Sequence, residues 1–269
     1  MTLQLFALLA CISSSTPELL IEDTLTFAPT LVQEAAPNQL PLEQLYNLAQ
    51  SITVKVHSGK NWGSGTLIHK QGQVYTVLTN LHVLTPGEPY RIETPDGKVY
   101  SAYTSEAVSL EDNDLAILHF RSTNSNYAVA SVENTSHLEV GDEVFASGFP
   151  VTLEPANKRD FVFTTGQVSL LLTQALVGGY QFGYNNDIQK GMSGGPILNR
   201  QGEVVGVNGM HKYPLWGDPY VFKDGSLPPL SLRELMVNSS WGIPIETFTQ
   251  LVQEAGGASA AARNLEFRI

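Results

Sequence analysis

The residue with the clearest chemical potential is a serine set among glycines, in the stretch Lys190-Gly191-Met192-Ser193-Gly194-Gly195-Pro196. Glycine adopts left-handed and strained backbone conformations that other residues avoid, so this turn can expose the Ser193 hydroxyl. The same turn can direct the backbone N–H groups of Gly191 and Ser193 at one point, as an oxyanion hole requires. We therefore interpret Ser193 as a candidate nucleophile.

A serine is a weak nucleophile unless a general base, usually histidine, takes its proton and a carboxylate orients that base. Two upstream segments can supply these groups. His82 follows an apolar, strand-like run in the segment 79–84, and Asp114 precedes another in the segment 111–118. The order along the chain is therefore His82, Asp114, Ser193, and this order differs among unrelated hydrolase folds.

Together, the segments Thr79–Val83, Asn113–Leu118 and Gly191–Pro196 resemble the trypsin-like serine proteases. The likeness is to their disulfide-free bacterial branch, which includes the high-temperature-requirement proteases, and is closest to the trypsin-like peptidase-domain proteins of cyanobacteria. It extends from about residue 52 to about residue 249. The resemblance implies peptide-bond hydrolysis of protein or peptide substrates through an acyl-enzyme, without a cofactor.

Other interpretations of these residues are possible. Residues 191–195 also match the G-x-S-x-G turn of α/β-hydrolases, but that fold requires an acid and then a histidine after the serine. Here the only later histidine is His211, and Asp218 and Asp224 follow it. A catalytically silent binding module with a protease fold is the competing function, and the complete set of three residues argues against it.

Composition limits the class of protein further. The chain of 269 residues is long enough for two packed barrels of roughly 90 to 120 residues each. Its net charge of −11 argues against nucleic acid or an anionic membrane as a partner. The single cysteine, Cys11, excludes an intrachain disulfide. Because the histidines lack metal-ligand spacing, no metal site is expected.

Alternating apolar residues between turn signals predict an all-β fold of short antiparallel strands, with a short N-terminal helix and a C-terminal helix. The resemblance implies that these strands form two six-stranded antiparallel Greek-key barrels, as in a chymotrypsin-like fold. Residues 41–128 are expected to form the first barrel, with His82 and Asp114, and residues 129–256 the second, with Ser193 and the closing helix. The strands are expected at 52–56, 63–68, 74–79, 90–93, 98–103 and 115–120, then at 143–147, 161–171, 180–184, 196–198 and 204–207; helices at 41–49 and 245–254; and a long loop at 211–236.

The two ends of the chain are expected to lie outside the barrels. The apolar stretch 3–12 resembles the core of an export signal, although no Lys or Arg precedes it. Residues 1–40 are therefore interpreted as an export signal and an acidic linker or pro-region, and we expect a periplasmic or extracellular protein. Cys11 offers a weak lipid-attachment match. Residues 257–269 are expected to be a tail. The sequence has no run of eighteen apolar residues, the length that a membrane-spanning helix needs.

The resemblance implies two departures from better-known relatives. Proteolytically activated trypsin relatives carry an aspartate before the nucleophile, which pairs with a new N-terminus, but this chain has Met192 there. We therefore expect the oxyanion hole to form without that ion pair. In addition, only about twenty residues follow the barrels, so no PDZ domain is expected at the C-terminus.

The sequence gives less information about primary specificity, that is, the residue preferred before the cleaved bond. In the trypsin-like family the base of the pocket lies six residues before the nucleophile, which is Asp187 here and implies selection of Lys or Arg. Lys190 could instead neutralise Asp187 in a surface pair. Gly209, Met210 and His211 are expected to follow along the pocket, Met210 as an apolar wall and His211 as a possible partner of acidic side chains. Basic, apolar and acidic preferences remain open.

Overall fold

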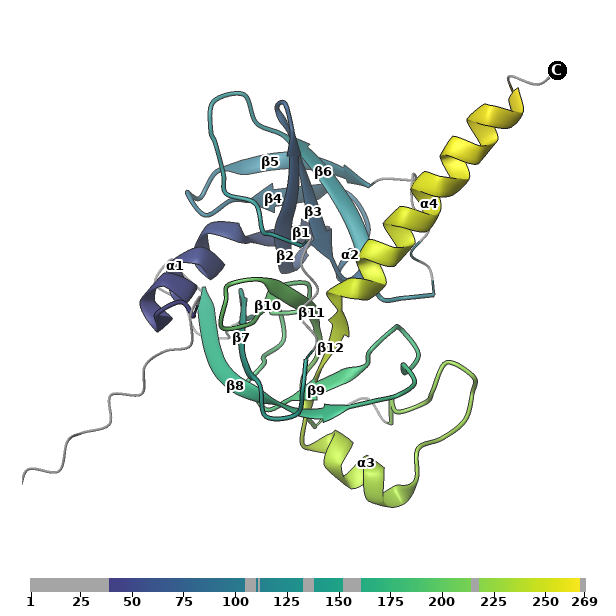
Figure 1. Ribbon diagram of the computed structural model, residues 1–269. Coiled ribbons are helices and arrows are strands. Elements are labelled where there is room, and N and C mark those ends of the chain that lie inside the picture. Colours follow the sequence, from purple (N-terminus) through teal and green to yellow (C-terminus); the bar gives the residue numbers. More distant parts are fainter. Residues whose placement is uncertain are drawn as a thin grey trace, which may run out of the picture. The chain divides into compact units, whose positions relative to one another are not determined.

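Twelve strands in the described part of the chain close into two antiparallel barrels of six strands each (Figure 1). The computed structural model describes residues 39–104, 110, 112–132, 138–151, 161–213 and 218–266, with side chains up to residue 255. The expected export signal, most of the linker and Cys11 lie outside the described residues. The fold expected from the sequence is confirmed.

The first barrel runs in the order β1-β2-β3-β6-β5-β4. Alternate side chains of β1 point inward, because successive residues of a strand face opposite sides of the sheet. These side chains pack with a stacked aromatic pair, Tyr75 and Phe120, whose ring centroids are 5.2 Å apart. The strands are β1 (Thr53–Ser58), β2 (Asn61–Gln71), β3 (Val74–Thr79), β4 (Tyr90–Glu93), β5 (Val99–Thr104) and β6 (Ala116–Arg121).

The second barrel runs in the order β10-β11-β12-β9-β8-β7. Its interior includes Val144, Phe182, Ile197 and Val205, together with Met192 from the glycine-rich turn. The last strand, β12, was not expected as a strand from the sequence, but it pairs with both β9 and β11 and so closes the barrel. The strands are β7 (Glu143–Gly148), β8 (Val162–Leu171), β9 (Phe182–Tyr184), β10 (Pro196–Leu198), β11 (Val204–Met210) and β12 (Ser240–Pro244).

Helix α1 (Leu42–Ile52) precedes the first barrel in the chain but packs against both barrels. Its buried side chains Leu45, Ala49 and Ile52 recur at helical spacing and belong to the same apolar cluster as β7, β10 and β11. The N–H of Leu40 donates to the carbonyl of Arg200 at 2.9 Å, which fixes the start of the helix on the second barrel. The helix therefore does not belong to the first barrel alone, with which its sequence position had grouped it.

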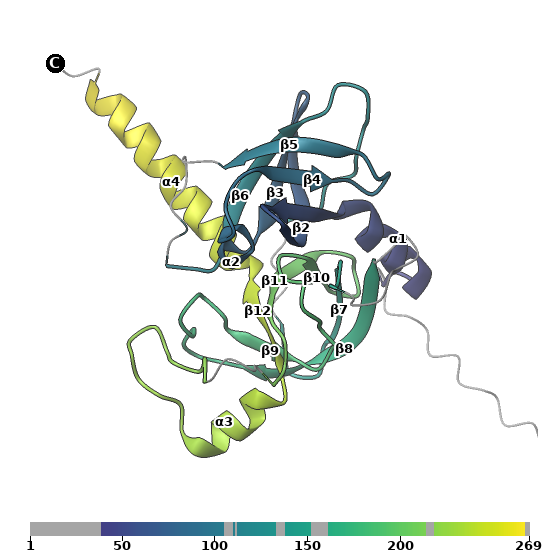
Figure 2. The same ribbon diagram turned by 180° about the vertical axis from the view of Figure 1, so that it is seen from behind.

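Three further helices differ from the sequence-based expectation. The short α2 (Leu81–Leu84) follows β3, and α3 (Leu230–Val237) lies inside the segment expected to be a loop. Helix α4 (Ile245–Glu266) begins as expected but continues through residues expected to be a tail. The alanine-rich stretch 258–262 explains the extension, because alanine has the highest helix propensity. Figure 2 shows α4 leaving the end of β12.

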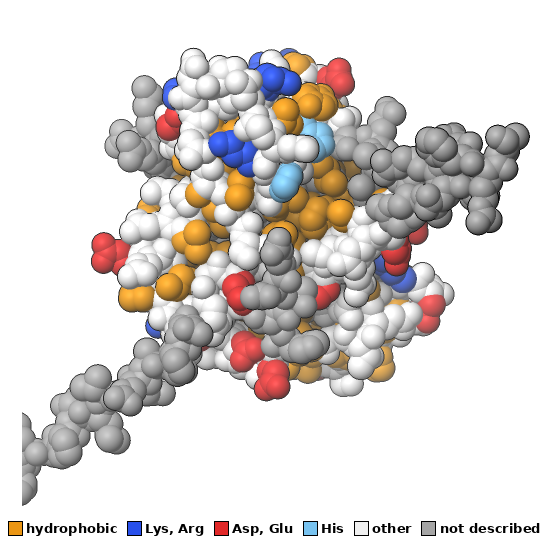
Figure 3. Space-filling model, turned by 45° about the horizontal axis from the view of Figure 1, so that its top comes forward, with side chains coloured by type: hydrophobic (Ala, Val, Ile, Leu, Met, Phe, Trp, Pro, Cys, Tyr) orange, Lys and Arg blue, Asp and Glu red, His pale blue; other side chains and the backbone are white. Residues whose placement is uncertain are grey.

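The surface has apolar as well as charged areas. On the face shown in Figure 3, hydrophobic side chains reach the surface beside histidine side chains, and Lys, Arg, Asp and Glu lie around them.

Among the described residues, no helix is long and apolar enough to cross a membrane.

Candidate active site

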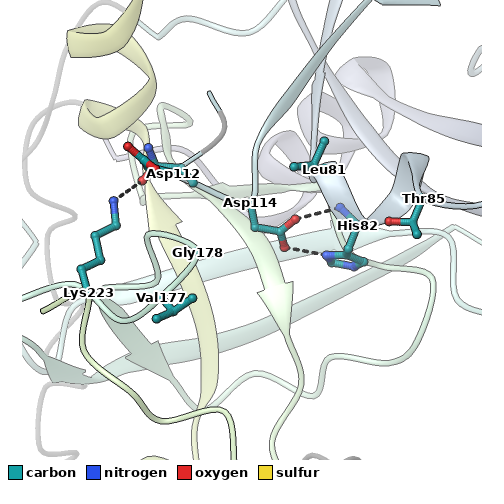
Figure 4. Close-up of a pocket in the computed structure, with 9 residues that line it drawn as sticks. Leu81, His82, Thr85, Asp112, Asp114, Val177, Gly178 and Lys223 are labelled. Carbon is teal, nitrogen blue, oxygen red and sulfur yellow. Dashed lines mark hydrogen bonds and ion pairs between the residues drawn. The ribbon is translucent and has the colours of Figure 1, made fainter. Parts of the chain in front are cut away.

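His82 and Asp114 are joined at the end of the first barrel, where β3 and β6 pair (Figure 4). The Nδ1 atom of His82 lies 2.6 Å from Oδ2 of Asp114, and the backbone N–H of His82 donates to Oδ1 at 2.8 Å. The side-chain amide of Asn80 donates to the Asp114 carbonyl at 2.7 Å. Because Nδ1 donates to the carboxylate, Nε2 is the acceptor of the neutral imidazole.

The carboxylate of Asp114 is held in its ionised form. Burial by itself would raise the pKa of Asp114, since a charge is poorly solvated there. The hydrogen bond and charge of His82, with a further hydrogen bond from the Tyr180 hydroxyl, outweigh burial and lower that pKa below its ordinary value. His82 is more accessible, with 48% of its side chain exposed against 15% for Asp114.

His82 and Ser193 line one cavity of about 790 Å³, and residues of both barrels form its walls. Asp114 is hydrogen-bonded to the same His82. The structure therefore brings together the three residues that the sequence singled out. Ser193 Oγ donates to the carbonyl oxygen of Gly209 on β11 at 3.1 Å in this structure. The remaining lining residues are Asn61, Trp62, Gly63, Val83, Pro86, Val151, Tyr180, Lys190, Gly191, Gly209, Met210 and His211.

Hydrogen bonds to the Lys190 and Met192 carbonyls orient the peptide groups that carry the N–H of Gly191 and of Ser193. The Lys190 carbonyl accepts a hydrogen bond from Val151 N–H at 2.7 Å. In a trans peptide the C=O and the next N–H point in opposite directions, so Gly191 N–H points away from Val151. The Met192 carbonyl likewise bonds Gly195 N–H, which turns Ser193 N–H the other way.

Gly191 is required by this conformation. Its φ is +97°, which side-chain-bearing residues rarely adopt, and a Cβ would lie 2.6 Å from the Phe149 carbonyl oxygen and 2.9 Å from Val151 N. Gly191 thus has the steric role that the sequence pattern suggested for the glycines around Ser193.

Ser64 of β2 joins the first barrel to the turn that carries Ser193. The Ser64 hydroxyl donates to the Gly191 carbonyl at 2.8 Å and accepts Phe149 N–H at 2.8 Å. The backbone N–H of Ser64 donates to the Ser193 carbonyl, also at 2.8 Å. Nothing in the sequence pattern indicates this residue, because its side-chain partners are 85 and 127 positions away in the chain.

Met192 anchors the same turn from inside the second barrel. Its side chain is completely buried in the apolar cluster with Val144, Phe182 and Ile197. Burial of such a side chain contributes roughly 1.5–3 kcal/mol. An apolar contact therefore occupies the position at which an ion pair would form in the activated trypsin relatives.

The four pocket candidates are placed differently. Gly209, Met210 and His211 line the cavity as expected. Asp187 does not: 69% of its side chain is exposed, and its Oδ1 lies 3.5 Å from Nζ of Lys212. The buried-carboxylate interpretation is therefore wrong, because the segment before the nucleophile buries Ile188 and turns Asp187 to solvent. Lys190, which was considered as a partner of Asp187, lines the cavity instead.

The described residues contain no group of three or more His, Cys, Asp or Glu side chains arranged to hold a metal ion. The site instead offers an imidazole bonded to a carboxylate and, in the same cavity, a serine hydroxyl, which are the groups that proton transfer and nucleophilic attack require. Two closed six-stranded barrels, with His82, Asp114 and Ser193 brought together between them, define the chymotrypsin-like class of proteins.

Comparison with known proteins agrees with this class. The family model described as a trypsin-like peptidase domain matches residues 63–207, which is more than half of the chain. The chain therefore belongs to the trypsin-like peptidase family.

Similar curated proteins are serine proteases by name. The chain is 32% identical over 149 residues to the putative serine protease HhoA of Synechocystis sp., covering 54% of this chain and 36% of that protein. It is 29% identical over 192 residues to serine protease HTRA1 of Xenopus laevis, covering 68% and 38%. It is 29% identical over 181 residues to the serine endoprotease DegS of Salmonella typhimurium, covering 66% and 47%. The chain thus matches less than half the length of each of these relatives.

Proposed function

We propose that this protein is a serine endopeptidase that hydrolyses peptide bonds through an acyl-enzyme intermediate. His82 takes the proton of Ser193 during attack on the carbonyl carbon and returns it to the leaving amine. Asp114 holds the imidazole in one tautomer and stabilises its protonated form. The backbone N–H groups of Gly191 and Ser193 bind the oxyanion.

One observation supports this proposal above the others: His82 is bonded through Nδ1 to Asp114 and shares a cavity with Ser193. In the free protein the Ser193 hydroxyl is bonded to Gly209 instead. This is compatible with catalysis, since hydrogen bonds between catalytic groups often tighten only when substrate binds. The orientation of the 190–191 and 192–193 peptides supports an oxyanion hole that exists before substrate arrives.

The decisive experiment is labelling with a fluorophosphonate, which reacts with an activated serine. We expect labelling of the parent protein, together with cleavage of casein. Ser193→Ala should abolish both, and His82→Ala should reduce both by several orders of magnitude. Ser122→Ala is the matched control, because it removes another buried serine hydroxyl, bonded to Tyr100 and Ser125, neither of which lines the cavity. A parent that binds peptides without labelling would support the silent binding module instead.

We further propose that the cleft prefers an apolar residue before the cut. Among its described lining residues none carries a carboxylate, whereas Trp62, Val83, Val151 and Met210 offer apolar surface. Lys190 contributes a positive charge, which disfavours Lys and Arg side chains. A library of peptides that differ only in the residue before the cut tests this preference through kcat/KM. Faster cleavage after Arg than after Leu would contradict it.

We also propose that the protein is exported and acts outside the cytoplasm. The apolar stretch at residues 3–12 supports this, although it lies outside the described residues. A similar protein of Chlamydia pneumoniae, 31% identical over 149 residues, is named a probable periplasmic serine endoprotease. Fractionation of cells, followed by N-terminal sequencing of the mature protein, tests export and any processing at Cys11.

A further inference from the structure

Tyr180 makes direct contact with the carboxylate that orients His82. It lies between β8 and β9, with 6% of its surface exposed, and its hydroxyl donates to Oδ2 of Asp114. The same oxygen receives Nδ1 of His82, while Oδ1 receives the His82 backbone N–H. Three donors from two barrels therefore surround one carboxylate.

Gly209 leaves the space that the tyrosine ring occupies. A Cβ added to Gly209 would lie 2.7 Å from both Cζ and Oη of Tyr180, closer than non-bonded atoms approach. The phenol end therefore fills the position where a side chain at residue 209 would stand. The Gly209 carbonyl also accepts the hydrogen bond of the Ser193 hydroxyl. Gly209 therefore contacts Ser193 through its carbonyl and leaves room for the tyrosine that contacts Asp114.

The backbone around Tyr180 fixes the ring in place. The Asp114 N–H donates to the Gly178 carbonyl at 2.8 Å, and the Leu176 N–H donates to the Tyr180 carbonyl at 2.8 Å. The segment carrying the tyrosine is thus paired with the segment carrying the carboxylate. Burial, together with the nearby Asp114 charge, raises the pKa of Tyr180 above its ordinary value, so that the phenol is a hydrogen-bond donor at neutral pH.

We propose that Tyr180 is a positioning residue for catalysis, and that it can serve as one only because residue 209 is glycine. Its hydroxyl holds the Asp114 carboxylate so that Oδ2 faces His82 Nδ1, and this hydroxyl acts on the substrate only through these two residues. The proposal rests on the serine endopeptidase activity proposed above.

The central test is reciprocal rescue between positions 180 and 209. Tyr180→Ala removes the donor to Asp114, and Gly209→Ser forces a side chain into the tyrosine ring, so we expect each single change to lower kcat about 10- to 100-fold. In the double variant the serine hydroxyl occupies the space of the missing phenol and can donate to Asp114. We expect the double variant to be more active than either single one.

A second test keeps the ring and removes only the hydroxyl. We expect Tyr180→Phe to lower kcat about tenfold while KM changes less than about threefold, since the ring that lines the cavity is retained. The proton NMR signal of the hydrogen on His82 Nδ1 should also move. Tyr220→Phe is the matched control, because it removes a buried phenol bonded to the Met236 carbonyl, and it should change neither readout.

The outcomes separate this proposal from the proposed function. If the parent is active and Ser193→Ala is not, but Tyr180→Phe retains full kcat and an unmoved NMR signal, the positioning role is wrong. A double variant no more active than the more active single variant also contradicts it, provided that thermal melts show all variants folded. A parent indistinguishable from Ser193→Ala overturns the endopeptidase assignment, and with it the role of Tyr180.

Discussion

The side-chain oxygen of Ser64, on the first barrel, lies 2.8 Å from the carbonyl oxygen of Gly191, on the turn that precedes Ser193. Since Gly191 supplies one of the proposed oxyanion donors, the first barrel contributes more than His82 and Asp114. It also fixes the backbone that faces the substrate carbonyl. The two barrels are therefore joined at the reacting centre itself.

The first prediction follows from this contact. Ser64→Ala leaves the buried Gly191 carbonyl and Phe149 N–H without their partner, at a cost of about 1–3 kcal/mol in the free energy of unfolding. We expect kcat to fall roughly tenfold with a smaller change in KM, because the loosened turn weakens oxyanion binding. Steady-state kinetics and urea unfolding measure both effects. A variant that is less stable but retains its kcat would contradict the link to the oxyanion hole.

The second prediction concerns the apolar anchor of the same turn. Met192→Ala leaves a cavity in the second barrel, and we expect a loss of about 2–5 kcal/mol in unfolding free energy. Met192→Leu, of similar volume, should cost less than about 1.5 kcal/mol and serves as the control. Equal stability of the alanine variant and the parent in urea unfolding would show that the anchor is unimportant.

The third prediction is a pH dependence of stability. Because the pKa of Asp114 is lower in the folded protein than its ordinary value of about 3.9, ionised Asp114 stabilises the fold above that value. This contribution is lost as pH falls through the folded pKa. The parent should therefore exceed Asp114→Asn in stability at pH 7 and at pH 5, and the difference should shrink below about pH 4. Urea unfolding at each pH measures it, and a difference that grows on acidification would reverse the sign.

The fourth prediction concerns Asp187. Its exposed pair with Lys212 is worth little, and it does not face the cavity. Asp187→Ser should therefore leave the ratio of kcat/KM for Arg and Leu peptides unchanged within about twofold, as should Lys212→Ser. Loss of an Arg preference in the first variant alone would restore the buried-carboxylate interpretation.

The sequence predicted eleven of the twelve strands and pointed to His82, Asp114 and Ser193 because each of these signals is local. Alternation of apolar residues reports which face of a strand is buried, and glycines around Ser193 report a special turn. The count that selected Asp187 failed because it assumed a fixed path for the pocket wall. The backbone instead buries Ile188 and exposes its neighbour.

Ser64 and Tyr180 could not be found in this way. Each acts on a residue far away in the chain, and a single serine between glycines or a single buried tyrosine carries no periodic signal. Gly209 is similar, since only the folded structure shows which side chain fills the space beside it. β12 and α3 were missed because each is a short element next to residues typical of turns.

Helix α1 affects the order in which the molecule can be completed. During synthesis the helix emerges before the first barrel, and the apolar surface that receives it includes residues of that barrel as well as of β7, β10 and β11, which emerge later. Its buried side chains must therefore remain partly uncovered while the first barrel folds, since domains fold as the ribosome releases them. The docking of α1 can therefore be completed only after the second barrel has formed.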